Sequence, residues 1–136
     1  MSTETTEEFY AKVRRFHAGS PVWSGGAELL IRTGWAHPGR RWMCPDGGVL
    51  LRMLDDDNIA AYSSGQRAVL ALGRSLLGGD PVRLDDCLRS ADFQLQAEML
   101  AAIAIACGRD DVADLASENV PTPEEFMAAL MRRKTQ

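Results

Sequence analysis

Side chains that could perform chemistry gather in the first half of the sequence. His37, Cys44 and Asp46 lie within ten residues, with His17 before them and the run Asp55-Asp56-Asp57 after them. Structural zinc sites usually draw pairs of ligands two to four residues apart, whereas His37 and Cys44 are seven apart and unpaired. A thiolate nucleophile needs a base, and His37 or His17 could serve Cys44 in that role. We predict no metal and no cofactor, and we keep a small enzyme or a ligand- or metal-binding protein using the His37, Cys44 and Asp55 region as an alternative.

A second group of polar residues begins the most regular helical pattern of the chain. Ser63, Ser64, Gly65 and Gln66 precede an apolar helical stripe that reaches Leu77. The free N–H groups at a helix start favour anions, so these four residues are a candidate anion-binding helix start. The spacing of Ser63 and Gln66 also fits a capping box, in which the two residues satisfy each other's backbone donors.

The segment from residue 62 to 76 resembles the signature segment of ABC-type ATPases, which reads LSGGQ followed by Arg and an apolar helix. Matching residue types stand at Ser63, Gly65, Gln66, Arg67, Ala71, Arg74 and Leu76. That family also needs a P-loop, whose backbone N–H groups and lysine hold the phosphates. The two lysines, Lys12 and Lys134, do not follow a glycine. We therefore interpret the resemblance as a false match.

Residues 60 to 108, approximately, also resemble small uncharacterised proteins of actinobacteria and their phages. The shared features are the Ser-Ser-Gly-Gln-Arg helix start, a Gly-Gly-Asp-Pro-Val turn, and an Ala- and Ile-rich helix that ends in Gly. The resemblance implies an origin and no activity. A composition of 13 Arg to 2 Lys with 18 Ala follows GC-rich codons and indicates the same kind of genome, a high-GC bacterium or its phage.

Tryptophan and arginine are concentrated in one part of the chain. Aromatic residues with arginines are typical of interaction surfaces, and less often of platforms that stack single-stranded nucleic acid. Packing of the tryptophans under loops is the structural alternative. We predict an interaction surface made from Trp23, Trp35, Trp42, Arg32, Arg40, Arg41 and Arg52.

Length and composition bound the remaining function classes. A chain of 136 residues with 46% hydrophobic content fits a single domain, 1–136, with a core that needs no metal or disulfide. A net charge of −4 offers phosphate backbones no overall electrostatic attraction. Three cysteines without a C-x-x-C pair read as reduced thiols, and the polar start of the chain is unlike a signal peptide. No apolar run approaches the length of a membrane span, so we expect a cytoplasmic protein.

Capping residues and apolar spacing predict a mainly α fold, a compact domain of four to six helices. The Asp92–Cys107 segment turns apolar on every side, so we expect it to be the central helix, packed all round. The other predicted helices are one capped by Thr5 that ends near His17, Ser63–Leu77, a short turn or helix at Leu84–Ser90, a short helix around Val112, and a terminal helix at 122–134 with Phe126, Met127, Leu130 and Met131 on one face.

The region from Pro21 to Tyr62 supports two interpretations. Glu28–Ala36, Arg41–Cys44 and Val49–Met53 could be three strands of a small β element. Alternatively, a strand or loop around Trp42 precedes a short helix from Val49, and we favour this second interpretation.

These patterns favour a non-catalytic protein-interaction or accessory factor. We make this choice for two reasons. The sequence contains no catalytic constellation, and it does contain the tryptophan and arginine cluster. Because four or five short helices can only just surround the Asp92–Cys107 helix, we also expect a homodimer. Nucleic-acid binding through a local Arg and Trp patch is a third alternative.

Overall fold

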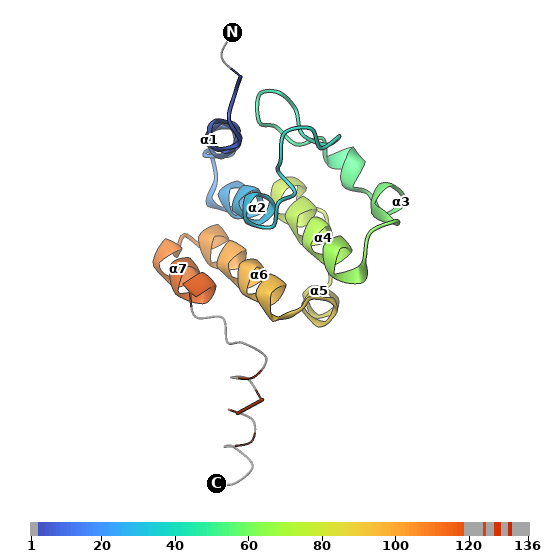
Figure 1. The fold of residues 1–136 in the computed structure, drawn as a ribbon, viewed down its shortest axis with the longest axis vertical. Coiled ribbons are helices and arrows are strands. Elements are labelled where there is room, and N and C mark those ends of the chain that lie inside the picture. Colours follow the sequence, from blue (N-terminus) through green and yellow to red (C-terminus); the bar gives the residue numbers. More distant parts are fainter. Residues whose placement is uncertain (1–2, 119–123, 125–126, 129–130, 132–136) are drawn as a thin grey trace.

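The computed structural model describes residues 3–118, 124, 127, 128 and 131. Within this part of the chain the elements are α1 (Thr6–Phe16), α2 (Pro21–Arg32), a 3-10 helix (Leu51–Leu54), α3 (Asp56–Ile59), α4 (Ser64–Gly78), α5 (Leu84–Ser90), α6 (Phe93–Ala106) and α7 (Asp110–Glu118). The predicted mainly α fold is confirmed (Figure 1). The terminal helix predicted at 122–134 lies largely outside the described residues.

Three helices begin where their capping residues predict. The Thr5 hydroxyl accepts a hydrogen bond from the backbone N–H of Glu8 at 3.1 Å and starts α1. Ser63 caps α4, and a carboxylate oxygen of Asp92 accepts from the N–H of Leu95 at 2.8 Å to start α6. These short-range bonds satisfy donors that a helix start would otherwise leave free, which is why the sequence alone locates them.

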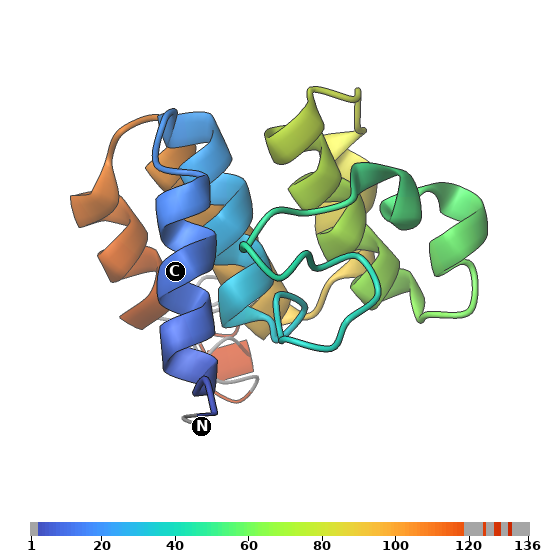
Figure 2. The same ribbon diagram turned by 90° about the horizontal axis from the view of Figure 1, so that it is seen from above.

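The central element is α2, and this corrects two predictions. The proposed strand at Glu28–Ala36 is wrong, because residues up to Arg32 belong to α2 and the rest form a turn. The expectation that the Asp92–Cys107 helix is packed on all sides is also wrong, because Leu100 of α6 is 51% exposed. Figures 1 and 2 show α2 beside α1, α4 and α6, all of which it contacts.

Two glycines allow α2 to occupy this position. A Cβ atom on Gly25 would lie 2.5 Å from the carbonyl oxygen of Ala102 in α6, and one on Gly26 would lie 2.8 Å from Cγ of Leu77 in α4. The helix therefore presents bare backbone to both neighbours at the points of closest approach. Glycine weakens helix propensity, so the residues that permit this packing also hide the helix in the sequence.

The hydrophobic core lies between these helices. Its fully buried side chains include Leu29 and Leu30 of α2, Val69 and Leu70 of α4, and Met99 of α6. Burying side chains of this size contributes roughly 1.5–3 kcal/mol each. The core thus depends on α2 as much as on the helices that the sequence predicted.

The segment after α2 is irregular and runs between α1 and α3 in both ribbon views (Figures 1 and 2). Among the described residues the β structure is one antiparallel bridge, between Met43 and Val49. The 3-10 helix Leu51–Leu54 follows directly. This arrangement agrees with a loop around Trp42 followed by a short helix, and the alternative of three strands is not observed in the described segment.

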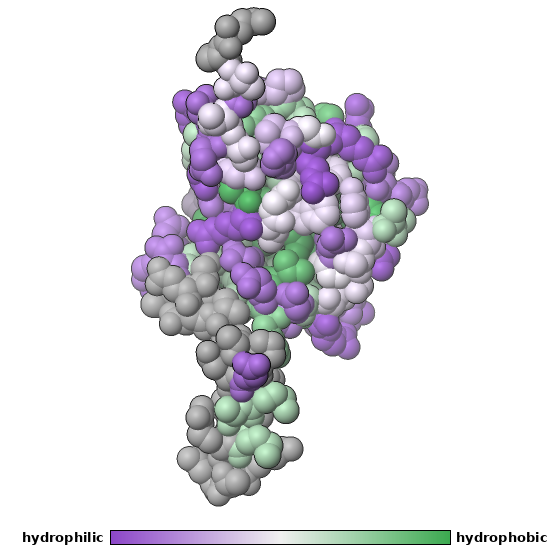
Figure 3. All heavy atoms as spheres, viewed as in Figure 1, coloured by the Kyte–Doolittle hydropathy of each residue, from purple (hydrophilic) through white to green (hydrophobic). Residues whose placement is uncertain are grey.

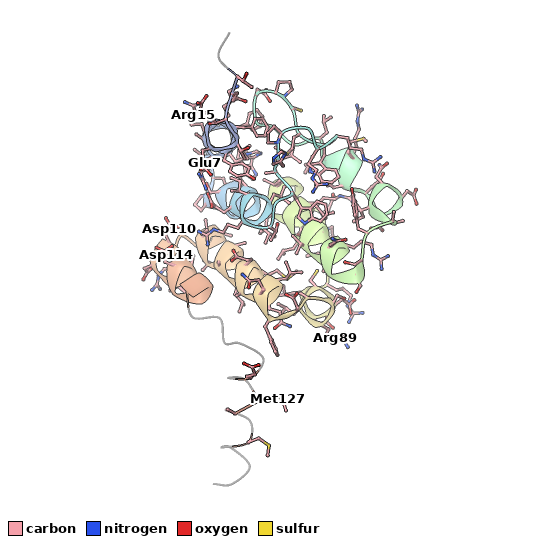
Figure 4. The ribbon with its side chains drawn as sticks, viewed as in Figure 1. Glu7, Arg15, Arg89, Asp110, Asp114 and Met127 are labelled. Carbon is pink, nitrogen blue, oxygen red and sulfur yellow. The ribbon has the colours of Figure 1, made fainter. Side chains whose placement is uncertain are left out.

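Charged side chains cover the outside of the bundle. Five of them are labelled in Figure 4, and all five are exposed: Glu7 and Arg15 of α1, Arg89 of α5, and Asp110 and Asp114 of α7. The space-filling view shows hydrophilic residues around the edge of this face, with smaller hydrophobic areas between them (Figure 3). Within the described residues, every helix is too short or too polar to cross a membrane.

Candidate functional site

An apolar pocket with a volume of about 270 Å³ lies where α1 meets α2. We call it the Trp23 pocket. Its walls come from the end of α1, the start of α2, the 44–49 turn, the 3-10 helix and the end of α4. The lining residues are Phe16, His17, Trp23, Cys44, Asp46, Gly48, Val49, Leu51 and Leu77.

Two large aromatic side chains lining this pocket remain in contact with solvent. Phe16 is 53% exposed and Trp23 is 47% exposed. α1 ends at Phe16, and Pro21 restarts the chain as α2 after a short turn, which brings the two residues to one pocket. The Trp23 ring lies over Gly19 of that turn, 3.5 Å from the position that a Cβ atom would take there.

A tight turn forms another wall of the pocket. Gly47 adopts a φ of 95° and lies so close to α1 that a Cβ atom would be 2.8 Å from the backbone of Lys12 and Val13. The carboxylate of Asp46 accepts a hydrogen bond from the N–H of Gly48 at 3.0 Å. Only glycine meets both requirements at position 47, a left-handed φ and the lack of a side chain. The turn therefore holds Cys44 and Asp46 beside the end of α1.

His17 is the buried polar residue of this pocket, with 6% of its surface exposed. Its Nδ1 lies 2.8 Å from the carbonyl oxygen of Val13. A carbonyl can only accept, so Nδ1 carries the hydrogen and Nε2 of the neutral ring has a free lone pair. The Ser24 hydroxyl donates to the His17 carbonyl at 3.3 Å, and the Phe16 ring lies 4.9 Å from the imidazole. The ring is thus held by α1, and the backbone of His17 is held by Ser24 of α2.

The other two tryptophans of the predicted surface are buried. Trp35 is 7% exposed and Trp42 is 1% exposed. They pack with Tyr62 at centroid distances of 5.0 and 6.3 Å, and Nε1 of Trp42 donates to the carbonyl of Trp35 at 2.8 Å. The Arg40 guanidinium covers the cluster, 4.6 Å from the Trp35 ring centroid. This contact stabilises the edge of the core and leaves these rings little surface for a partner.

The remaining arginines of that set are distributed over several elements. Arg32 forms ion pairs with Glu28 at 3.3 Å and Glu98 at 3.9 Å. Arg41 donates to the carbonyl of Asn58 at 2.7 Å, and Arg52 is exposed on the 3-10 helix. The structure therefore does not gather the seven residues into one surface.

Of the polar residues considered for enzyme or metal chemistry, His17, Cys44 and Asp46 line the Trp23 pocket, whereas His37 and Asp55 do not. His37 is exposed, with Nδ1 2.7 Å from the carbonyl of Pro38. Asp55 caps α3 by accepting from the backbone and side-chain nitrogens of Asn58 at 2.9 and 2.8 Å. Cys44 shares the Trp23 pocket with His17 instead. Among the described residues, no three His, Cys, Asp or Glu side chains are grouped as metal ligands would be.

At the candidate anion-binding helix start, some of the backbone N–H groups already have hydrogen-bond partners. Ser63 and Gln66 form a complete capping box, with distances of 3.3 Å from the Gln66 N–H to the Ser63 hydroxyl and 3.0 Å from the Ser63 N–H to the Gln66 amide oxygen. Ser64 lines a larger groove beside Arg67, and Gly65 lies against the backbone of Ser90. Anion binding by these four residues stays a prediction.

Each of two larger hollows contains an ion pair. The hollow between α4 and α5, about 760 Å³, contains the Arg74–Asp80 ion pair at 2.8 Å. The hollow between α2 and α7, about 590 Å³, contains the Arg14–Glu28 pair at 2.6 Å, which raises the pKa of Arg14. Bound pairs of this kind offer a ligand less than free groups do. We select the Trp23 pocket because two half-exposed aromatic side chains, Phe16 and Trp23, line it.

From the sequence we selected Trp23 for an interaction surface and Cys44 and Asp46 for metal or enzyme chemistry, but we did not select Phe16. Phe16 follows Phe9 and Val13 at helical spacing, so the periodicity placed it with the core, whereas Phe9 and Val13 are buried and Phe16 is not. His17 was considered only as a base or a ligand. Comparisons with protein-family models, with curated proteins and with solved structures found no match to this chain.

Proposed function

We propose that this chain is a non-catalytic interaction factor that binds another protein through the Trp23 pocket. The observation that carries the proposal is the pair of half-exposed aromatic rings, Phe16 and Trp23, that line one apolar pocket. Large apolar side chains on the surface of a folded chain often mark contact sites. Tryptophan in particular is enriched among residues that dominate binding energy.

The size of the pocket favours a side chain of a protein over a free small molecule. Sites for drug-sized ligands usually measure roughly 300–1,000 Å³ and enclose most of the ligand. The Trp23 pocket measures about 270 Å³, so it suits one or two side chains of a partner. Phe16 and Trp23 would then cover the partner's surface around that anchor.

A peptide-display selection tests this proposal with a random library in place of the partner. Immobilised wild-type chain should enrich a family of peptides from the library, and the Trp23→Ala chain should not retain them. Leu84→Ala is the matched control, because Leu84 is another exposed apolar residue and lies at the start of α5. Peptides that bind wild type and Trp23→Ala equally, or no enrichment at all, would contradict the proposal.

The alternative functions receive less support from the geometry. An enzyme would need a nucleophile and a base in contact, and Cys44 and His17 share the pocket without a hydrogen bond between them. Nucleic-acid binding would need exposed ring faces, and two of the three tryptophans are buried. Saturable turnover of a substrate would favour an enzyme over our proposal. Saturable binding of an oligonucleotide would favour a nucleic-acid-binding protein.

Our proposal also includes a homodimer and a cytoplasmic location in a high-GC bacterium or its phage. The outer face of α6 supports the dimer, because Leu100 and Cys107 are exposed there and Ala104 between them is only partly buried. These residues follow each other at spacings of three and four, so they share one side of the helix. Three free cysteines support a reducing compartment.

A further inference from the structure

We propose that the Trp23 pocket receives an aromatic ring carrying an N–H donor, the indole of a tryptophan side chain in the partner protein, with Nε2 of His17 as the acceptor. This inference rests on the proposed function and specifies its partner. It follows from one polar atom that the folded chain leaves without a hydrogen bond at the wall of the pocket.

His17 Nε2 is that atom. Nδ1 donates to Val13, and Nε2 has no hydrogen-bond partner among the described residues. Among the described residues, Oε2 of Glu98 is the one side-chain N or O atom that has no hydrogen bond and is also fully shielded from solvent. Nε2 of His17 is therefore not fully shielded and keeps some access to open space. His17 is 94% buried and lines the Trp23 pocket, and we infer that this space is the pocket.

The other walls determine what kind of donor fits. Apolar surface of the pocket that His17 lines comes from Phe16, Trp23, Val49, Leu51 and Leu77. Aromatic rings pack well against such walls, in stacked or edge-to-face contact with the rings of Phe16 and Trp23. An occupant without a donor would leave Nε2 desolvated and unpaired, which lowers affinity. The geometry thus selects for an aromatic ring with a polar N–H.

A cationic side chain fits less well. The one carboxylate among the lining residues, Asp46, is exposed and already accepts from the Gly48 N–H. A guanidinium or ammonium group would lose its hydration against five apolar side chains, and an exposed, hydrated carboxylate such as Asp46 would offset only part of that loss. An indole N–H carries no charge and needs only the single acceptor that His17 offers.

Two small probes separate the donor from the ring. Indole has the N–H, and 1-benzofuran has almost the same shape with an oxygen in its place. Binding of each to the full-length isotope-labelled chain is measured by NMR titration. We expect indole to bind wild type roughly 3- to 10-fold more tightly, the effect of one hydrogen bond. The 15N resonance of His17 Nε2 should shift with indole and not with 1-benzofuran.

Matched variants assign the preference to His17. Asparagine places its amide near Nδ1, so His17→Asn can keep the donor to Val13 and lacks the Nε2 acceptor. Glutamine reaches the position of Nε2, so His17→Gln restores an acceptor there. The preference for indole should fall to about 1-fold in His17→Asn and return in part in His17→Gln. If a variant does not fold, the wild-type ratio and the Nε2 resonance still decide.

Several results would overturn the inference: equal affinities of the two probes for wild type, a preference that persists in His17→Asn, binding of neither probe, or tighter binding of butylammonium than of indole. The peptide selection with Trp23→Ala is independent of these titrations. Equal binding of both aromatic probes with a selection that depends on Trp23 would refute only the role of His17. Loss of the selection itself would refute the proposed function.

Discussion

At the scale of single residues, two tryptophans have opposite roles because their surroundings differ. Trp42 is enclosed by Trp35 and Tyr62, and its ring nitrogen donates to a backbone carbonyl. Trp23 lies on the first turn of α2 with half of its surface in solvent. Composition and spacing cannot distinguish the two, because burial depends on elements far away in the sequence. The two residues therefore make a matched test.

Replacement of each tryptophan by alanine should have very different effects on stability. Trp42→Ala removes a fully buried ring and should lower the free energy of unfolding by about 3–5 kcal/mol. Trp23→Ala should lower it by about 1 kcal/mol or less, as surface substitutions usually do. Urea unfolding followed by circular dichroism measures both. Similar losses for the two variants would mean that Trp23 belongs to the core.

The three cysteines should differ in reactivity with a thiol reagent. Burial, followed by the negative charges of Asp86 and Asp85, raises the pKa of Cys87. The folded state holds this proton to higher pH than the unfolded state, so the associated stability is present below the ordinary thiol pKa and is lost as alkaline pH rises through the folded value. Because the thiolate is the reactive form, Cys87 should react only after unfolding.

Cys107 is exposed and Cys44 is partly buried, so we expect modification in the order Cys107, Cys44, Cys87. Mass spectrometry of the chain after timed reaction with iodoacetamide at mildly alkaline pH gives the order directly. Rapid modification of Cys87 in the native protein would show that α5 does not pack this side chain against α4.

At the scale of elements, the fold depends on how closely α2 approaches its neighbours. Gly25→Ala would place a methyl group 2.5 Å from the Ala102 carbonyl oxygen, a contact that requires the two helices to separate. Alanine improves helix propensity by roughly 0.5–1 kcal/mol. The clash with backbone should outweigh that gain and produce a net loss of about 1–3 kcal/mol.

Thermal unfolding of Gly25→Ala and of Gly19→Ala tests this packing. Gly19 lies in the turn before α2, and a methyl group there would meet the Trp23 ring at an ordinary contact distance of 3.5 Å. We expect a lower Tm for Gly25→Ala and little change for Gly19→Ala. An unchanged or higher Tm for Gly25→Ala would show that α2 and α6 are not in close contact.

The predictability of each element follows from where its information lies. Thr5, Ser63 and Asp92 form caps with residues three positions away, so the starts of α1, α4 and α6 could be predicted from the sequence. α2 could not, because Gly25 and Gly26 lower its helical signal and the reason for them is contact with Ala102 and Leu77. A pattern within one segment contains no record of such long-range contacts.

The candidate site shows the same limit. Trp23 could be selected by residue type, but its companions depend on the angle between α1 and α2 and on the turn at Gly47. The free nitrogen of His17 depends on a hydrogen bond to its own helix and on burial by its neighbours. Sequence spacing can predict the hydrogen bond within the helix, but it cannot predict the burial. The pocket is therefore visible only in the folded chain.

At the scale of the whole molecule, the chain has a second exposed apolar feature in addition to the Trp23 pocket. Leu100 lies in the middle of α6 and is half exposed, in a helix without a lysine or an arginine. A symmetric dimer would place this face against its copy, as two-fold interfaces do. The dimer and the partner would then occupy different surfaces of the same molecule.

Sedimentation velocity over a range of concentrations tests the dimer. Wild type should associate as concentration rises, and Leu100→Arg should remain monomeric because it would bury an unpaired charge. Leu84→Arg, a change at an exposed leucine of α5, should behave like wild type. A monomer at all concentrations, or a dimer unaffected by Leu100→Arg, would exclude α6 as the interface.

The most direct test of the central proposal is the location of a bound peptide on the chain. A peptide enriched by wild type is titrated into the isotope-labelled protein, and the shifted NMR resonances are mapped. We predict shifts at Phe16, His17, Trp23 and the 44–51 segment, including the Trp23 indole N–H, with the indole signals of Trp35 and Trp42 unchanged. Shifts confined to α5 or to the outer face of α6, with the Trp23 indole unaffected, would contradict the proposal.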